Sequence, residues 1–403
     1  MGLDLTTAAD ALKEFYLPVL REQLVNKNEY LAQIETSSES VEGLETVLSL
    51  HVGRNEGIGA RLELETLPTA GSQSYKKQRV GLTRQYGQIQ VSGPVIAAAA
   101  SDRGGWISAV ESETKGVVMD EKRDEERQLL GTSNGVIAQF AAYGPGDSPV
   151  TTATKTQLRH LRVGMVIDIG TVASPTTIAS ARTIEAVDLT TGAITISGAD
   201  VTTTTAHFVF RSGNGGDVAN SSKKEYTGLQ TIVDSAGSLF GVDPATYPVW
   251  SSYEDAAAGA AISDTLIEEL IDEVDINSPA GPPTWGIADH GQVRKLAASL
   301  KSQKRFTNTV ALKGGFSALE VSTASGSINV SALRDCPTET FFGLNPEHLG
   351  LHEASAWDFL DLDGAVLSRV ANKDAYGATL YHYSEHVTDV RNAHGKITGL
   401  AAA

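Results

Sequence analysis

The chain has 403 residues, of which 41% are hydrophobic, and this length predicts two or three domains at about 150 residues each. Its 32 basic and 49 acidic side chains give a formal net charge of −17, which excludes a protein that reads DNA sequence in the grooves, because such a protein needs positive surface against the phosphates. The single cysteine, Cys336, excludes a disulfide framework and a cysteine-based metal cluster, and the lack of a long apolar stretch or a basic, apolar leader predicts no transmembrane helix, no membrane partner and no signal peptide.

The first predicted element is a helix over residues 10–34, where apolar side chains recur at helical spacing. Pro18 lies inside it, so we expect a kink or a break there. An amphipathic helix of this kind is typical of an arm that packs on another surface. A strand is predicted next, over residues 42–52.

Residues 53–87 form a glycine-rich segment in which two stretches, 61–65 and 80–84, alternate with period two. This alternation predicts a two-stranded ribbon. The ribbon has few apolar positions, and a hairpin without a core is not stable alone in water. It therefore needs a partner surface.

The same segment is basic although the chain is acidic. Between residues 54 and 86, six basic and three acidic side chains give +3, and subtracting this from −17 leaves −20 for the remainder. The split suits docking of the ribbon on another copy of the chain, but a solvated loop with ordinary charges explains it equally well. The candidate inter-subunit contact residues are Arg54, Arg61, Lys76, Lys77, Arg79 and Arg84.

A long helix is predicted after a strand at residues 89–96. Asp102 is a suitable N-cap and Gly131 a suitable C-terminal glycine, which gives a helix of about 28 residues and about 42 Å. Its second half, residues 120–127, is charged on every face. This pattern is typical of a helix that lies across a surface rather than inside a core.

Residues 136–224 are dominated by small and β-branched side chains, and a hairpin turn is predicted at 188–192. Short strands separated by turns indicate a small barrel or sandwich. Glycine-rich flanks at 143–149 and 213–216 lead us to expect an insertion in a larger fold. The predicted strands cover residues 163–169, 181–187, 193–197 and 207–211.

From residue 225 to 293 there are twelve acidic side chains and no lysine or arginine. An amphipathic helix is predicted within this stretch, at 262–274, and a strand at 285–287 leads into a helix at 291–304. The whole pattern predicts an α+β fold with antiparallel strands from distant parts of the chain. Further strands are predicted at 319–321, 328–330 and 340–342 and in the alternating tail, 357–400.

Three local patterns resemble functional motifs, and we interpret each of them structurally. Residues 131–135 (GTSNG) match a nucleophile elbow, but that elbow follows a strand, whereas this motif follows a helix and is interpreted as a helix stop. Residues 361–364 fit a calcium loop at neither end and are interpreted as a tight turn. Cys336 has no activating base nearby in the sequence and is expected to be a buried thiol.

The strongest metal-like pattern is HYSEH at residues 382–386, which matches the inverted zinc-protease motif. His382 and His386 could share a zinc ion on a helix, but their flanks look extended, and a strand separates residues four apart by about 13 Å. A zinc hydrolase using His382, Glu385 and His386 is therefore the least favoured hypothesis. With no phosphate-binding or dinucleotide glycine motif present, we expect no enzyme, no metal and no cofactor.

The order of these elements resembles the major capsid protein of tailed bacteriophages, the Johnson fold first seen in a Hong Kong phage. The local resemblance lies at residues 88–95 (QIQVSGPV), 128–135 (QLLGTSNG), 226–229 (YTGL) and 285–290 (WGIADH). About 90 residues separate the second and third of these segments, which fits an inserted β-domain.

The resemblance implies an α+β capsid fold whose parts have stated boundaries. These are an N-terminal arm (1–40), peripheral-domain strands (41–54 and 88–101), an extended loop (55–87), a spine helix (102–131), an inserted β-domain (137–223), a connection (224–260), an axial domain (261–352) and peripheral return strands (353–403).

The resemblance also implies a mechanical function. Many copies would form the hexamers and pentamers of an icosahedral virion shell around double-stranded DNA, assembled in the bacterial cytoplasm with portal and scaffolding proteins and with a decoration protein as a further partner. The extended loop would lie over a neighbouring subunit, and the arm would latch another. An encapsulin-like compartment that packages an enzyme is the alternative with the same fold.

Overall fold

The structure is a computed structural model, and the chain in it divides into two compact units, each assembled from segments distant in sequence. Unit 1 comprises Met1–Ala32, Thr83–Gln230 and Ser355–Ser384, and unit 2 comprises Gln33–Leu82, Thr231–Ala354 and Glu385–Ala403. The residues that the structure describes are 29–38, 41–43, 45–93, 103–140, 150–151, 155–216, 223–302, 308–311, 317–323, 326–361 and 368–402. Helices and antiparallel strands occur in both units, which confirms the α+β prediction.

Unit 1 contains the long helix that the sequence predicts. Helix α4 (Arg103–Leu130) has 28 residues. It ends at the GTSNG motif, where the Gly131 amide donates to the Gln128 carbonyl oxygen (3.1 Å) and Ser133 adopts a left-handed φ of 69°. The motif is thus a helix stop, as predicted. No helix of the described residues is long and apolar enough to cross a membrane.

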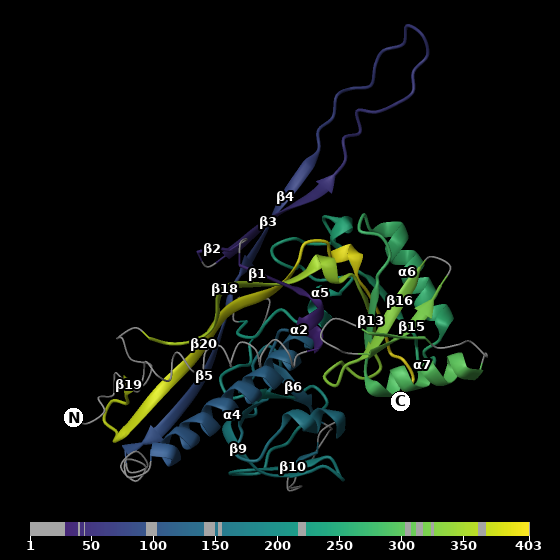
Figure 1. The fold of residues 1–403 in the computed structure, drawn as a ribbon. Helices are drawn as coiled ribbons and strands as arrows, with labels where there is room; N and C mark the ends of the chain where they lie inside the picture. Colours follow the sequence, from purple (N-terminus) through teal and green to yellow (C-terminus); the bar gives the residue numbers. More distant parts are fainter. Residues whose placement is uncertain are drawn as a thin grey trace. The chain divides into compact units, whose positions relative to one another are not determined.

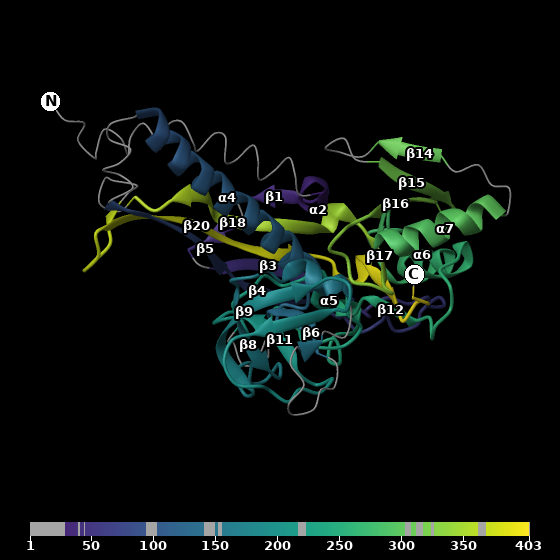
Figure 2. The ribbon, with the colours of Figure 1, turned by 90° about the horizontal axis from the view of Figure 1, so that it is seen from below.

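Strand β5 (Thr83–Ser92) pairs antiparallel with β20 (Ala375–Thr388), from Ser92↔Ala375 to Thr83↔Ser384. Figure 2 shows α4 running alongside this strand pair. A Cβ atom at Gly87 would lie only 2.8 Å from a methyl carbon of Val117, so glycine permits the close approach of helix and strand. The core between them contains Ile89, Val118, Trp357, Phe359, Ala378 and Leu380.

The charged half of α4 differs from its prediction. Lys122, Glu125 and Arg127 are 6%, 3% and 7% exposed, so these side chains do not lie in solvent. The prediction that this helix lies across a surface did not include this burial, which arises because segments far away in the sequence supply partners such as Glu225 for Arg127 and Arg211 for Asp124.

The predicted insertion forms a six-stranded sheet in the order β6-β11-β8-β9-β10-β7. Its strands are β6 (Val136–Gln139), β7 (Val150–Thr151), β8 (Val166–Gly170), β9 (Ala179–Asp188), β10 (Ala193–Ile196) and β11 (Phe208–Arg211). All four predicted strands are confirmed. The predicted hairpin turn is confirmed too, since Asp188 accepts from the amides of Thr190 (2.8 Å) and Thr191 (3.3 Å) and Gly192 has a φ of 85°.

Unit 2 contains a seven-stranded sheet in the order β12-β21-β17-β13-β16-β15-β14. Its strands are β12 (Tyr253–Ala256), β13 (Trp285–Ala288), β14 (Asn308–Ala311), β15 (Ser317–Ser322), β16 (Ser327–Ala332), β17 (Phe341–Leu344) and β21 (Gly395–Thr398). Helices α6 (Asp264–Asn277) and α7 (His290–Ser302) confirm the two predicted helices. Ser263 caps α6 by accepting from the Leu266 amide at 3.3 Å, and Leu270 packs where Gly343 and Gly395 leave room for it.

The remaining elements are short helices, short strands and 3-10 turns, apart from the long strand β18. Strand β1 pairs in parallel with β18 from Glu35↔Gly350 to Ser37↔His352. Of the predicted N-terminal helix, only the end is described, and Pro18 lies outside the described residues. Cys336 is a buried thiol that forms no disulfide, as predicted. The elements are α2 (Glu29–Gln33), β1 (Glu35–Ser37), β2 (Val41–Glu42), α5 (Leu229–Ile232), β18 (Leu349–Phe359), β19 (Ser368–Arg369) and the 3-10 turns η1 (Lys155–His160), η3 (Pro248–Trp250), η5 (Pro346–His348) and η6 (Arg391–Ala393).

Candidate inter-subunit interface

The predicted ribbon exists as a hairpin of unit 2, but with other strands. Strand β3 (Glu45–Gly53) pairs antiparallel with β4 (Ser74–Gly81), and Figure 1 shows the connecting loop projecting well past the ends of both strands. The prediction of a strand at residues 61–65 is wrong. These residues turn instead, because the Glu65 amide donates to the Leu62 carbonyl oxygen (3.2 Å) and Leu64 has a left-handed φ of 69°, which no strand residue adopts.

Glycines explain how the two arms of the loop stay together without a ladder of hydrogen bonds. A Cβ atom at Gly57 would lie 2.7 Å from the Gly71 nitrogen, and one at Gly71 would lie 2.4 Å from Asn55 Oδ1. Asn55 Oδ1 also accepts from the Gly57 amide at 2.7 Å. Only glycine permits this contact of backbone with backbone.

The hairpin has an inner and an outer face at its root. Thr46, Gln78 and Val80 are buried on the inner face, where Gln78 Nε2 donates to the Thr388 carbonyl oxygen at 2.8 Å. The Arg79 amide donates to the Phe240 carbonyl oxygen at 3.2 Å. These hydrogen bonds fix the root in unit 2, while Lys77 and Arg79 on the outer face are exposed.

The six predicted contact residues are all exposed, but the structure does not bring them all together. Arg54 and Arg61 lie in the loop between the strands. Lys76, Lys77 and Arg79 lie on β4. Arg84 is not in the loop but on β5 of unit 1, opposite Tyr383.

Two of the β4 cations have partners within unit 2. Arg79 Nη1 lies 3.4 Å from Glu45 Oε2, an exposed pair of the kind that contributes little to stability. Lys76 Nζ lies 5.9 Å from the centre of the Tyr247 ring, within the range of a cation–π contact. Lys77 lies on the outer face and is exposed.

Charged and large apolar side chains are distributed unevenly along the hairpin. The loop from residue 54 to 73 has two arginines and three glutamates, hence −1, whereas β4 has three cations and no anion. The tip exposes large apolar side chains between its charged ones: Ile58, Leu62, Leu64 and Leu67 are 80%, 77%, 101% and 79% exposed. This surface could not be predicted from the sequence, because the alternation of leucine with charged residues at 61–65 is typical of a strand.

The zinc-like pattern lies on strand β20, as its extended flanks predicted. His382 is buried in unit 1, where its Nδ1 lies 3.0 Å from Tyr226 Oη and its ring stacks on Trp357 with centroids 4.7 Å apart. His386 follows in the segment that belongs to unit 2. On an extended strand the two imidazoles cannot share one ion, and among the described residues no group of three potential ligands could hold a metal.

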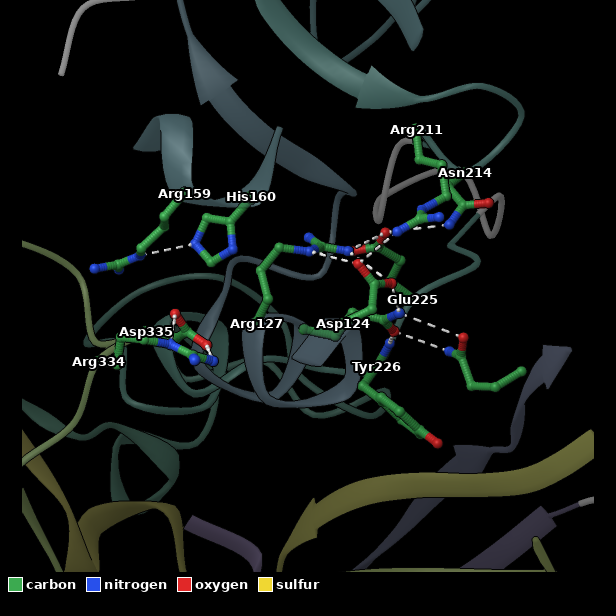
Figure 3. Close-up of polar contacts among 12 residues, drawn as sticks. Asp124, Arg127, Arg159, His160, Arg211, Asn214, Glu225, Tyr226, Arg334 and Asp335 are labelled. Carbon is green, nitrogen blue, oxygen red and sulfur yellow. Dashed lines mark hydrogen bonds and ion pairs between the residues drawn. The ribbon is translucent and has the colours of Figure 1, made fainter. Parts of the chain in front are cut away.

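A buried ion network lies at the C-terminal end of α4 (Figure 3). Arg127 contacts Asp124 (3.1 Å) and Glu225 (2.7 Å). Asp124 also contacts Arg211 of the insertion at 3.1 Å. Asn214 Nδ2 donates to Glu225 at 3.4 Å. The network therefore joins the long helix to the end of the insertion.

The electrostatics of this network set the charge states of its carboxylates. Burial alone would raise the pKa of Asp124, but Arg127 and Arg211 hold it below its usual range. The pKa of Glu121, one turn earlier, is raised to about 7 by burial and by Asp124, against the opposing effect of Arg211. Asp124 is thus ionised in its pairs, while Glu121 titrates near neutral pH.

By sequence, the chain matches neither a family model nor a curated protein. By structure, it is similar to a chain of the cyanophage A-1(L) capsid asymmetric unit, with 11% identity, 94% of each chain covered and a TM-score of 0.52. The chain has the capsid fold of tailed bacteriophages. Matches to the holo-SrpI encapsulin complex of Synechococcus elongatus PCC 7942 (8% identity, 94% and 89% covered, TM-score 0.47) and to Mycobacterium phage Patience (10%, 100% and 90%, 0.46) extend over similar lengths.

Proposed function

We propose that this chain is a major capsid protein, many copies of which form the hexamers and pentamers of an icosahedral shell around double-stranded DNA. The observation that carries the proposal is the projecting β3–β4 hairpin of a chain with a capsid fold. Its tip exposes large apolar side chains, and a two-stranded hairpin without a core needs a partner surface. Another copy of the chain supplies that surface in a shell.

The hairpin is the contact element in this proposal. Arg54, Lys76, Lys77 and Arg79 lie exposed along it, and the body that would receive it is acidic, so opposite charges steer one subunit onto the next. Because hairpin and receiving surface are different patches, the contact is heterologous, and repeated contacts of this kind build rings such as hexamers and pentamers when the rotation between subunits closes. Arg84 would contribute from β5, and the arm over residues 1–40 would latch another subunit.

The acidic balance suits a DNA container. The stretch from residue 225 to 293 has no lysine or arginine, and like charge repels phosphates. Walls of this kind enclose DNA without binding it tightly or by sequence. In this proposal the protein is no enzyme, has no cofactor, and assembles in the bacterial cytoplasm with portal and scaffolding proteins, with a decoration protein as a further partner.

Electron microscopy of the purified, full-length protein tests the proposal. We expect closed shells, or rings of five and six subunits that close when scaffolding and portal proteins are co-expressed. Shells that close without these partners around a co-purified enzyme would favour the encapsulin-like alternative. A protein that stays monomeric under every condition would refute a shell function.

A further inference from the structure

Four of the nine histidines of the chain lie in one part of unit 2. His348 and His352 lie in η5 and near the start of β18, whereas His386 lies in β20 and His394 directly follows η6. The last two are completely buried and the first two are partly buried. Histidine changes its charge near neutral pH, so buried histidines that lie together are candidates for a pH-dependent contact.

The hydrogen bonds of His394 require a neutral ring. Its Nδ1 accepts from the Asn345 amide at 3.3 Å, so the ring proton lies on Nε2, which is 3.2 Å from Thr388 Oγ1. Thr388 Oγ1 donates in turn to the His348 carbonyl oxygen at 2.9 Å. These bonds connect η5 with the end of β20, and a second proton on His394 would break the one from Asn345.

The short strand β1 lies beside this group and is weakly held. It pairs in parallel with β18 through three residues, with Ser37 opposite His352, and its Glu35 and Thr36 are exposed. A hollow of about 240 Å³ lies next to it. An exposed strand with so few contacts is typical of an element that opens locally at low cost. The polar residues that line the hollow are Glu35 and Ser37 of β1, His352 of β18, Glu347 and His348 of η5, and Asp389 after β20.

The charged groups that face His352 do not compensate for its burial. Burial lowers the pKa of His352, and Asp389 and Glu35 oppose this effect only in part. Asp389 also pairs with His348 at 3.0 Å, and a proton on His348 strengthens that pair. Leu48 is the residue that β3 contributes, and none of the described residues lining the hollow is a lysine or an arginine. His352 therefore takes up a proton more readily when β1 has moved away and water reaches the ring.

We propose that the histidines around this hollow form a pH-sensitive latch, which holds β1 on β18 at neutral pH and releases it when His352 takes up a proton. The latch works within one subunit. Its meaning for assembly rests on the proposed shell function, because β1 lies in the predicted arm over residues 1–40. Release of β1 would detach this end of the arm from its own subunit, so that contacts made by the arm become weaker in acid.

Hydrogen exchange of the full-length, unassembled subunit tests the latch. Exchange rates are divided by the intrinsic rate at each pH, which gives the protection of the β1 amides. Between pH 7.5 and 5.0 we expect this protection to fall about tenfold. The limit is about thirtyfold for one proton on a group whose ordinary pKa is about 6.5.

Two variants and a control assign the effect to His352. His352→Gln should keep the protection constant within about twofold, because glutamine takes up no proton. His290→Gln should behave like the parent, since His290 is exposed at the start of α7. Glu35→Gln should extend the fall to lower pH, because the Glu35 carboxylate favours a protonated His352, and it provides the test if His352→Gln does not fold.

Equal protection of β1 at both pH values would overturn the latch, and so would an unchanged fall in His352→Gln or in Glu35→Gln. The exchange measurement uses unassembled subunits, so its result does not depend on shell formation. Failure of the unmodified chain to form shells would overturn the proposed function and leave the latch in place.

Discussion

Replacing Arg127 by methionine should destabilise unit 1 more than any neighbouring surface change. The substitution keeps the length of the side chain but removes the guanidinium from Asp124 and Glu225, whose side chains are 14% and 3% exposed. Removing one partner of a buried ion pair costs about 3–5 kcal/mol, because a buried charge is left uncompensated.

The structure indicates where in that range the loss falls. Asp124 retains Arg211 at 3.1 Å and Gln128 at 2.8 Å. Glu225 retains, among the described residues, the longer hydrogen bond from Asn214 Nδ2 at 3.4 Å. Most of the penalty therefore falls on Glu225, and we expect a loss of about 3 kcal/mol in the free energy of unfolding.

Urea unfolding of unassembled subunits, followed by circular dichroism, measures this loss, and hydrogen exchange assigns it to α4 and the end of the insertion. Arg123→Met is the matched control, since Arg123 is 52% exposed and lies 4.0 Å from Asp120, a pair worth less than about 1 kcal/mol. An Arg127→Met/Glu225→Met variant should recover much of the loss, because it removes both charges together. Equal effects of Arg127→Met and Arg123→Met would refute the reasoning.

Three further predictions concern the hairpin and pH. Replacing Lys76, Lys77 and Arg79 by alanine should slow assembly, most visibly at low salt, while leaving the urea midpoint of the subunit unchanged; light-scattering kinetics at two ionic strengths check this, and unchanged kinetics would contradict steering by the stem. Gly57→Ala should disorder the loop, since its Cβ would meet the Gly71 nitrogen at 2.7 Å, and it should reduce assembly without unfolding the subunit, as proteolysis of the loop would show. Burial and nearby His348 and His386 lower the pKa of His394 from 6.5 to about 3; because the unfolded chain binds the proton first, the free energy of unfolding should fall as the pH drops from about 6.5 to about 3, and His394→Gln should flatten that slope in acid titrations.

Local patterns in the sequence predicted most of the regular elements. Helices α4, α6 and α7 can be predicted from the spacing of their side chains and from the residues at their ends, such as Ser263 before α6 and Gly131 after α4. The turn at residues 188–192 depends on hydrogen bonds between residues two to four apart. Features of this range can be predicted because their determinants are close in the sequence.

The candidate interface could be predicted only in part. Its position in a glycine-rich ribbon was predicted, but the period-two pattern at residues 61–65 could not show that those residues have no strand partner. The hydrogen bond from Arg61 Nε to the Thr66 carbonyl oxygen could not be predicted either, because it depends on how the loop turns that carbonyl group toward Arg61. The burial of Arg127 depends on Glu225, 98 residues away, and no local pattern signals such a pairing.

Some of the charged side chains that count in the formal net charge are buried. Arg391 is 1% exposed and donates to five backbone carbonyl groups, among them those of Ile232 and Gly237. Lys396 is 8% exposed and pairs with Glu254 at 3.2 Å, and Arg127 is used inside unit 1. These three cations count in the formal net charge, but their charged groups are not accessible to another molecule. Buried carboxylates, among them Glu125, Glu225 and Glu385, are withdrawn from the surface as well. Burial therefore leaves the acidic balance of the surface nearly unchanged, and the contrast with the exposed cations of β4, on which docking between copies depends, rests on the composition of the whole chain.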